Sequence, residues 1–398
     1  MKRPKVLVFS SLLPLPVDRG DRNRLFHTLR LLDHMADVRL VCLNRLWEPQ
    51  LKPSAMSSYL ACAVLPVSRQ EIQWQVMRSI LRGRPHTLFR FGSPRVCDFV
   101  LNQAHDFQPD ICWLYQLSAF PLIPRLKPCR LILDLVDSPS YHANQACRTP
   151  GLSWRARGLN ALLGRTLAFE RDAVRQCDVT LVSSAKDLEH LNRCHQRPDK
   201  VVQLDNCVPS ALLEGPLNAQ GGDVSQILFV GNLAYPPNEA GVRLFARDAL
   251  PLIRQSIPKA EFHVCGVRGE RLAAELGGLP GVVFRGFVED LAPLYGACAA
   301  AVVPIALATG TQYKLLEAMA GGAPVVASTC VTEAVGARHG DQLWVADSAQ
   351  DVAQGVIALI RDRALAARLA AAARAFIAAR YTWESQEQTL RHVLGIFS

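Results

Sequence analysis

The sequence predicts an α/β protein made of two Rossmann-like domains, each a doubly wound parallel sheet covered by helices. Three observations predict this fold class. The chain has 398 residues, more than one ordinary hydrophobic core holds. Hydrophobic residues make up 49% of it, so each half can bury a core of its own. Short apolar runs alternate with segments of helical period along the whole chain, which is typical of βαβ units.

The expected strands are short apolar runs bounded by turn residues. In the first half they are 5–10, 38–43, 61–67, 111–115, 131–135, 179–184 and 201–204. In the second half they are 227–231, 261–266, 282–285, 299–304, 324–328 and 343–346.

A segment rich in Pro, Gly, Asn, Ser and Asp, residues 206–224, separates the two sets of strands and is the expected linker. We therefore expect an N-terminal domain at 1–215 and a C-terminal domain at 216–381. A last helix within 382–398 is expected to pack back on the first domain. Ligands of open parallel sheets bind beyond the carboxyl ends of the strands, so the expected site is a cleft across which the two domains face each other.

The positive charge of the chain lies in its first half. Residues 1–222 hold 29 Lys and Arg against 19 Asp and Glu, and the whole chain has a net charge of +9. A basic domain suits anionic lipid headgroups, a phosphorylated acceptor or nucleic acid. The arginines are scattered and match no RNP or zinc-finger pattern, so we expect no nucleic-acid partner. A solvated basic face is the alternative.

The 12 cysteines contain no C-x-x-C pair, and several lie inside apolar strand-like runs. This pattern indicates buried thiols in a reducing compartment, and we expect a cytoplasmic protein without a disulfide frame or cysteine metal site. No window holds about 18 uninterrupted apolar residues, so any membrane contact is expected to be peripheral. The apolar start of the chain is interrupted by Pro14 and Pro16, and a first strand explains it better than a signal peptide.

The most informative segment, residues 310–326, predicts a glycine loop, a short helix and a buried strand. Lys314 falls in the first helical turn and Glu317 follows three residues later, so both project from the same face. The helix N-terminus and Lys314 suit a diphosphate, and Glu317 can accept hydrogen bonds from sugar hydroxyls. An ordinary surface salt bridge between the two side chains is the alternative interpretation.

With these motifs in place, the chain resembles the GT-B glycosyltransferases, and specifically the retaining, bacterial glycosyl transferases group 1 family. The resemblance covers nearly the whole chain. Its strongest carriers are Ile227–Asn232, Gly286–Leu291 and Lys314–Pro324. In the first half, Asp134–Ser138 and Phe169–Arg171 resemble the sugar transferases associated with exopolysaccharide assembly.

The resemblance implies a nucleotide-diphosphate sugar as co-substrate, held mainly by the C-terminal domain, with no other cofactor. It implies a glycan or lipid-linked acceptor on the N-terminal domain. Glu317 would then bind the ribose hydroxyls and Lys314 the diphosphate. The other implied donor-binding residues are Gly231, Asn232, Gly286, Phe287, Val288, Thr309, Gly310, Thr311 and Gln312.

The sequence departs from the family pattern in two places. Members often carry a second Glu eight positions before the one at Glu317, where this chain has Thr309. An Arg and a Lys usually follow the glycine at 231, whereas residues 232–238 supply no cation. Neutralisation of the diphosphate then depends on Lys314, on helix dipoles and on an arginine of the N-terminal half.

Sugar transfer requires fixed positive charge at the departing diphosphate, which makes Lys314 a catalytic candidate. The sequence contains no Asp-x-Asp for a divalent metal, so we expect metal-independent transfer. Asp137 follows an apolar strand and is the candidate for activating the acceptor, with Asp134 and His142 behind it. A turn-forming or helix-capping role of Asp137 is equally open, as is a role limited to orienting the acceptor.

The loop 16–22 after the first strand is the expected acceptor side of the site. Gly20 would bring backbone close to the point of transfer, and Arg19 or Arg22 could reach the diphosphate. Solvated arginine side chains are the alternative.

Residues 71–84 combine an apolar stripe of Trp74, Met77, Ile80 and Leu81 with three arginines, Arg78, Arg82 and Arg84. This pattern is typical of a helix at the surface of an anionic membrane. A helix that turns the same stripe to the protein core fits equally well.

The sequence therefore predicts a cytoplasmic glycosyltransferase of hexosyltransferase type in exopolysaccharide or cell-surface polysaccharide biosynthesis, with a place at the inner face of the membrane left open. Two other functions stay open: a catalytically idle sensor of nucleotide sugars, and a nucleotide-sugar 2-epimerase. Thr309 counts against the epimerase, which would need carboxylates around the sugar. A dinucleotide-dependent oxidoreductase is disfavoured because neither half shows G-x-G-x-x-G after its first strand.

Overall fold

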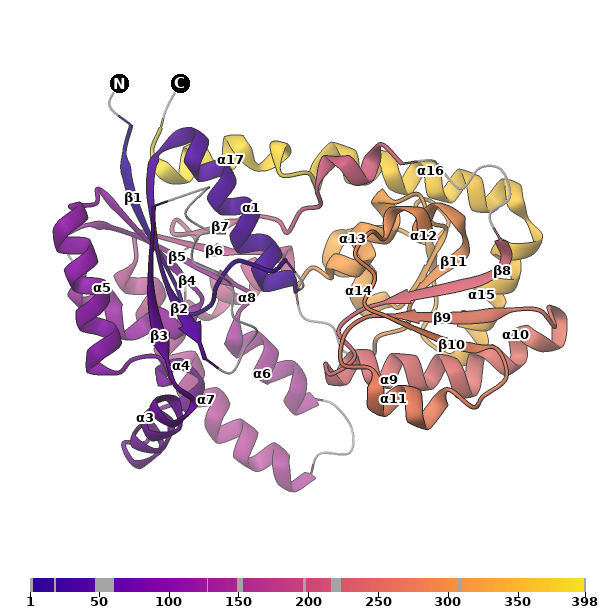
Figure 1. The fold of residues 1–398 in the computed structure, drawn as a ribbon, viewed down its shortest axis with the longest axis horizontal. Coiled ribbons are helices and arrows are strands. Elements are labelled where there is room, and N and C mark those ends of the chain that lie inside the picture. Colours follow the sequence, from indigo (N-terminus) through magenta and orange to yellow (C-terminus); the bar gives the residue numbers. More distant parts are fainter. Residues whose placement is uncertain are drawn as a thin grey trace. The chain divides into compact units, whose positions relative to one another are not determined.

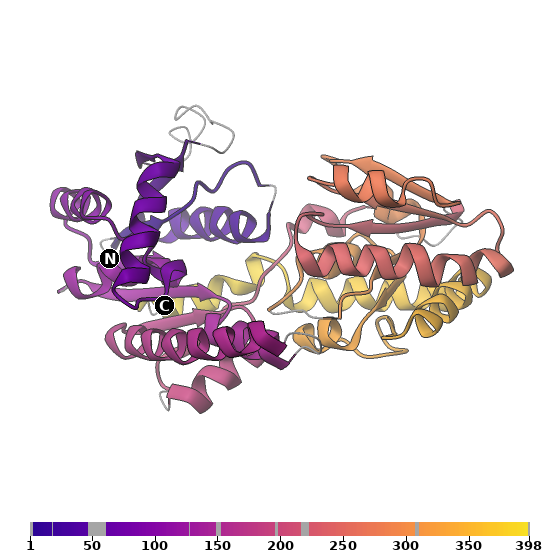
Figure 2. The ribbon, with the colours of Figure 1, turned by 90° about the horizontal axis from the view of Figure 1, so that it is seen from below.

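The computed structural model describes residues 3–17, 19–46, 61–126, 128–148, 153–195, 198–215, 223–306 and 310–396. The chain folds into two compact units (Figures 1 and 2). Unit 1 consists of Met1–Asp205 and Glu387–Ser398, and unit 2 of Asn206–Gln386.

Unit 1 is built on a seven-stranded parallel sheet in the order β3-β2-β1-β4-β5-β6-β7. The chain enters at the middle of the sheet and winds outward in both directions, which is the doubly wound pattern. The strands are β1 (Lys5–Ser10), β2 (Asp37–Arg45), β3 (Ala61–Val67), β4 (Ile111–Tyr115), β5 (Arg130–Val136), β6 (Val179–Val182) and β7 (Val201–Gln203).

Both faces of this sheet are buried, because alternate strand residues enter two different hydrophobic clusters. One face is covered by α1 (Gly20–Met35) and by the C-terminal α17 (Glu387–Leu394) (Figure 1). The helical segments of unit 1 that contribute to the other cluster are α4 (His86–Phe89), α5 (Pro94–Phe107), the 3₁₀ segment Leu117–Arg125, α7 (Ser153–Gln176) and α8 (Ala185–His195). Two more helices are α3 (Arg69–Leu81) and α6 (Pro139–Arg148).

Unit 2 repeats the architecture with a six-stranded parallel sheet in the order β10-β9-β8-β11-β12-β13. Its strands are β8 (Asp223–Val230), β9 (Glu261–Cys265), β10 (Val282–Gly286), β11 (Cys298–Val303), β12 (Val325–Ala327) and β13 (Trp344–Val345). Its α-helices are α9 (Pro236–Leu244), α10 (Leu250–Ser256), α11 (Glu270–Leu276), α12 (Ala292–Ala297), α13 (Tyr313–Ala320), α14 (Thr329–Val335), α15 (Ala349–Arg361) and α16 (Arg363–Arg380). Short non-α turns cover Ser210–Leu213, Phe245–Ala249 and Glu384–Gln386.

All thirteen expected strands form, with ends that shift by a few residues. The expected boundary at 215 lies ten residues too late, because the units divide between Asp205 and Asn206, and residues 216–222 of the expected linker lie outside the described residues. The segment 206–215 belongs to unit 2. Its Val208 N–H donates to the Tyr381 carbonyl at 2.9 Å, and Arg374 Nη1 donates to the Gly215 carbonyl at 2.6 Å. The last helix starts at Glu387 and groups with unit 1, where Leu390 and its neighbours join the cluster under α1.

Candidate active site

The start of α13 in unit 2 carries the predicted cation and carboxylate. The chain leaves β11, passes Gly310 in the left-handed region at φ 64°, and enters the helix from the extended residue Gln312. Leu315 and Leu316 fall on the buried side and pack in a hydrophobic cluster under β11 and β12, so Lys314 and Glu317 are left half-buried at the edge. The periodicity of the helix thus places both charged groups where the sequence predicted them.

Lys314 is held by amide oxygens and not by a carboxylate. Its Nζ donates to Asn238 Oδ1 at 2.7 Å and to Gln312 Oε1 at 3.4 Å, and it lies 5.9 Å from the centre of the Phe229 ring. Burial lowers the pKa of Lys314 to about 8, although the negative charge of Glu317 acts to raise it. A cation kept without a carboxylate partner is poised for an anionic ligand.

Glu317, the second charged residue of α13, is also half-buried, and its pKa shifts in the opposite direction. Burial raises its pKa to about 7, although the charge of Lys314 works in the other direction. The carboxylate lies within 4.0 Å of no Lys or Arg nitrogen in the described residues, so the alternative of a Lys314–Glu317 surface salt bridge is wrong. Its oxygens remain able to accept hydrogen bonds from a ligand.

Three glycines let the ends of neighbouring strands approach one another beside Lys314. Gly231 follows β8, where a Cβ atom would stand 2.8 Å from Asn238 Nδ2 and 3.3 Å from Lys314 Cε. Gly266 follows β9 at φ 150°, where a Cβ atom would stand 1.8 Å from the Gly231 carbonyl oxygen. Gly286 ends β10 at φ 69°, and its carbonyl accepts from the Gly266 N–H at 2.7 Å. Only glycine fits at positions 231 and 266 without displacing neighbours.

Asn238 connects the glycine turn to the lysine, and the sequence analysis missed it. It is buried at the start of α9, and its Nδ2 donates to the Asn232 carbonyl at 2.8 Å while its Oδ1 accepts from Lys314. The Asn232 side chain meanwhile accepts from the Ala234 N–H at 3.0 Å and tightens the turn. The chain thus uses an asparagine to fix Lys314 in the loop where the resemblance led us to look for a second cation.

The resemblance also implies donor-side residues after β10 and before α13. Phe287 and Val288 follow Gly286, two strands from Gly231, and Phe287 is 63% exposed. Thr311 is buried, and its carbonyl accepts from Asn206 Nδ2 at 3.4 Å. Thr309 lies outside the described residues.

In unit 1, the residue before Asp137 has an unusual backbone. Val136 ends β5 at φ 67°, a strained conformation for a β-branched residue, and the pairing of β5 with β6 shifts register between Asp134 and Val136. Such irregularities re-aim the side chains that follow them. They set Asp137 at the carboxyl end of β5, as predicted.

Asp137 and His142 form a partly exposed acid–base pair. Asp137 Oδ1 accepts from Ser183 Oγ at 2.7 Å, and Oδ2 lies 3.6 Å from His142 Nε2. Their side chains are 29% and 36% exposed. Burial would lower the pKa of His142, but the close approach and charge of Asp137, with the charges of Asp187 and Glu170, raise it above its usual value.

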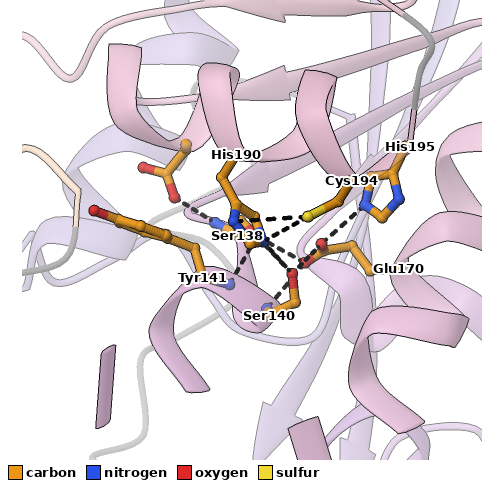
Figure 3. Close-up of polar contacts among 8 residues, drawn as sticks. Ser138, Ser140, Tyr141, Glu170, His190, Cys194 and His195 are labelled. Carbon is orange, nitrogen blue, oxygen red and sulfur yellow. Dashed lines mark hydrogen bonds and ion pairs between the residues drawn. The ribbon is translucent and has the colours of Figure 1, made fainter. Parts of the chain in front are cut away.

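Glu170, a fully buried residue of α7, accepts hydrogen bonds from the loop after Asp137. Figure 3 shows Ser138, Ser140 and His195 around this carboxylate. Oε2 accepts from Ser138 Oγ at 3.0 Å and the Ser140 N–H at 3.1 Å, and Oε1 accepts from Ser140 Oγ at 2.6 Å. His195 Nε2 lies 3.1 Å from Oε1, and His190 Nε2 lies 2.8 Å from Ser140 Oγ. We call these five residues the Glu170 network.

A second buried carboxylate, Asp187, holds the same loop from α8. It accepts from the Ser138 N–H at 2.9 Å and from Ser184 Oγ. Burial and the charge of Asp137 raise its pKa to about 7, although hydrogen bonds from Ser184 and Ser138 oppose the shift. The Glu170 network and Asp187 together fix the backbone that carries Asp137 and His142.

The two arginines of the expected loop 16–22 turn inward or pair locally. Arg19 Nη2 lies 3.1 Å from Asp21 Oδ2, and α1 begins at Gly20, so the last three residues of that expected loop are helical. Arg22 is only 4% exposed, so the alternative of a solvated side chain is wrong for it. Asp134 cannot activate an acceptor, because its side chain is fully buried and its Oδ1 lies 3.0 Å from Arg24 Nη2. Sequence reasoning did not find Arg24.

Within the part of the chain that the structure describes, no group of three His, Cys, Asp or Glu side chains is arranged to hold a metal ion. No described helix is long and apolar enough to cross a membrane. Neither finding tests metal independence, which stays a prediction.

Comparison with known proteins gives matches in sequence and in fold. Residues 224–362 match the family Glycosyl transferases group 1. A stretch of 129 residues, 30% of this chain, is 26% identical to an uncharacterized 44.6 kDa protein in the cps region of Klebsiella pneumoniae and spans 33% of that protein's length.

Solved structures align over nearly the whole chain. Sucrose-phosphate synthase from Thermosynechococcus elongatus has a TM-score of 0.73 at 16% identity and covers 99% of this chain and 98% of its own. Anabaena HepE in complex with UDP-glucose has a TM-score of 0.68 at 14% identity, with 99% and 100% covered. A variant of S. aureus TarM in complex with fondaparinux, α-GlcNAc-glycerol and UDP has a TM-score of 0.69 at 10% identity, with 99% and 100% covered.

Proposed function

We propose that this chain, a group 1 glycosyltransferase with the GT-B fold, transfers a hexosyl group from a nucleoside diphosphate sugar to a glycan or lipid-linked acceptor. The observation that carries the proposal is Lys314, a cation fixed beside the Gly231 turn by Asn238, with Glu317 one turn further along α13.

A nucleotide sugar fits this arrangement because it carries the negative charge that Lys314 can bind and the hydroxyl groups that can donate to Glu317. A diphosphate against Lys314 Nζ and the α13 N-terminus replaces amide oxygens with full negative charge. A ribose hydroxyl donates to Glu317. UDP sugars are the first donors to test, because the HepE and TarM structures hold UDP-glucose and UDP.

Different residues act on the two partners of the transfer, the departing diphosphate and the acceptor hydroxyl. Lys314 and the α13 N-terminus stabilise the departing diphosphate, and we propose that they do so without a metal and with retention at the sugar carbon. Asp137 accepts a hydrogen bond from the acceptor hydroxyl, and His142, whose pKa is raised above its usual value, lies beside that carboxylate. Whether Asp137 takes the proton or only orients the acceptor is decided by the Asp137→Asn experiment below.

The biological setting is proposed from one relative. Its place in a cps region supports a role in exopolysaccharide or cell-surface polysaccharide biosynthesis. The acceptors of such a pathway suit a protein at the cytoplasmic face of the membrane, in peripheral contact with anionic lipid.

The test is donor-induced stabilisation of the purified chain. A nucleotide sugar at about 100 times its Kd stabilises the binding unit by about 2.7 kcal/mol, or roughly 5–10 °C in melting temperature. Lys314→Ala and Glu317→Ala should each lose most of that shift. The exposed residues Lys259 and Glu270 provide matched controls, and Lys259→Ala and Glu270→Ala should keep it.

Unchanged shifts in the Lys314 and Glu317 variants would contradict the proposed donor site. Release of free nucleoside diphosphate that depends on an acceptor identifies a transferase. Tight donor binding without such release across a broad acceptor panel would favour the nucleotide-sugar sensor instead.

A further inference from the structure

Helix α3 turns its apolar side chains away from the core of unit 1. Trp74, Met77, Ile80 and Leu81 are 69%, 47%, 58% and 82% exposed, and they make up half of the large hydrophobic side chains that are exposed in the described residues. Trp74, Met77 and Leu81 follow the three- and four-residue spacing of one helix face. The alternative from the sequence, a stripe facing the core, is therefore wrong.

The opposite face of α3 fixes this orientation. Ile72 packs against the hydrophobic cluster of unit 1, Gln75 Nε2 donates to the Gly92 carbonyl at 3.2 Å, and Ser79 is buried. Ser68 caps the helix by accepting from the Glu71 N–H at 3.1 Å. The outward stripe is thus a property of a docked helix and not of a loose one.

The charged residues of α3 after its first turn, and of the segment that follows the helix, are all positive. Residues 72–97 contain five arginines and no Asp or Glu. Arg78 is exposed between Met77 and Leu81, and Arg82 and Arg84 are exposed just beyond the end of the stripe. Glu71, which precedes this segment, is paired with Arg95 at 2.8 Å.

We propose that the α3 face, defined as Trp74, Met77, Leu81, Arg78, Arg82 and Arg84, docks on the surface of an anionic phospholipid bilayer. An apolar stripe inserts at the level of the headgroups, where Trp is favoured, and arginines at its border meet lipid phosphates. A purely apolar partner would leave the arginines unmatched, whereas an anionic bilayer satisfies both halves of the face. The inference deepens the lipid-linked acceptor of the proposed function, and it is tested without any transfer assay.

The experiment is co-sedimentation of the full chain with vesicles of phosphatidylcholine alone and of phosphatidylcholine mixed equally with phosphatidylglycerol. We expect binding to the anionic vesicles only. Each arginine near such a surface contributes about fivefold to partitioning, so the triple variant Arg78→Glu, Arg82→Glu, Arg84→Glu should bind at least about 100-fold more weakly. The matched control reverses three other exposed arginines of unit 1, Arg125, Arg171 and Arg175, and changes the net charge equally.

The apolar half of the face has its own readout. Trp74→Gln with Leu81→Gln should weaken binding at least tenfold, and lipids with brominated acyl chains should quench wild-type tryptophan fluorescence but not that of Trp74→Phe. Circular dichroism and the donor-induced melting shift, which reports on unit 2, should be unchanged in every variant. A folded variant that keeps its donor shift but loses lipid binding supports the docking surface independently of the proposed function.

Three results would overturn the proposal. The wild-type chain could fail to bind anionic vesicles, or the α3 and control reversals could weaken binding equally, which would indicate diffuse charge alone. Alternatively, a dimer in solution that Trp74→Gln with Leu81→Gln converts to monomer, with vesicle binding unaffected, would assign the face to a second copy of the chain.

Discussion

Glu170→Gln should destabilise unit 1 far more than its conservative chemistry suggests. The carboxylate accepts from Ser138 Oγ at 3.0 Å and from the Ser140 N–H and Oγ at 3.1 and 2.6 Å, and His195 lies 3.1 Å away. An amide keeps one accepting oxygen, which must face the Ser140 N–H because that group can only donate. The new NH₂ then faces Ser140 Oγ and His195, and the charge that strengthened all these bonds is gone.

The size of the effect follows from these contacts. Hydrogen bonds to a charged group contribute about 1.5–3 kcal/mol each, and a buried group left unsatisfied costs about 1–3 kcal/mol. Since most of the bonds persist in weakened form, we expect a loss of about 3 kcal/mol. For a unit of this size that is roughly 6–12 °C in melting temperature.

The assay is guanidinium unfolding followed by circular dichroism, fitted with one transition per unit because two units need not unfold together. The control is Glu189→Gln on α8, an exposed glutamate 2.8 Å from Arg193, which should cost less than about 0.5 kcal/mol. The donor-induced shift of unit 2 should survive in both variants. If Glu170→Gln behaved like Glu189→Gln, the Glu170 network would not be holding the Asp137 loop.

Three further predictions concern the site itself. Asp137→Asn should keep the donor-induced melting shift while transfer falls about 10²–10⁴-fold if the carboxylate takes the proton; a loss below about tenfold would limit Asp137 to orienting the acceptor. Gly231→Ala should abolish donor binding, because its Cβ would stand 2.8 Å from Asn238 Nδ2, whereas Gly278→Ala, with open space around it, should be neutral in a titration of donor by calorimetry. Because the folded-state pKa of Glu317 is raised from 4.5 to about 7, the ligand-free chain should lose stability as pH rises between these values, and pH-dependent unfolding of Glu317→Gln should show a smaller loss.

The strands were predictable because parallel strands are buried on both faces and read as continuous apolar runs. The unit boundary was not, because residues 206–215 look like a linker and join unit 2 through partners far along the chain, such as Thr311 and Tyr381. The composition of residues 206–215 does not reveal which distant residues they pair with.

The same limit explains which site residues were found. Lys314, Glu317 and Gly231 belong to local motifs, whereas Asn238 acts on Lys314 across 76 residues of sequence. The buried partners of the Asp137 loop come from α7 and α8. Asp187 alone had a local signal, because Ser184 and Asp187 form the S-x-x-D pattern of a helix start, and its N–H does bond to Ser184 Oγ at 3.2 Å.

Helix α3 shows a different limit. The spacing of Trp74, Met77 and Leu81 defines a face but not the direction in which it points. That direction is decided by Ile72, Gln75 and Ser79 on the other side of the helix, and two of these three are polar residues that do not indicate a buried face in the sequence.

The close stacking of Gly231 and Gly266 limits how this protein could be engineered for other sugars. A Cβ atom would stand 2.8 Å from Asn238 Nδ2 at position 231 and 1.8 Å from the Gly231 carbonyl oxygen at position 266, so the proposed donor site presents main-chain atoms at both glycines. A library aimed at altered donor choice should leave both glycines fixed, keep Asn232, whose side chain accepts from the Ala234 N–H, and diversify the exposed Phe287.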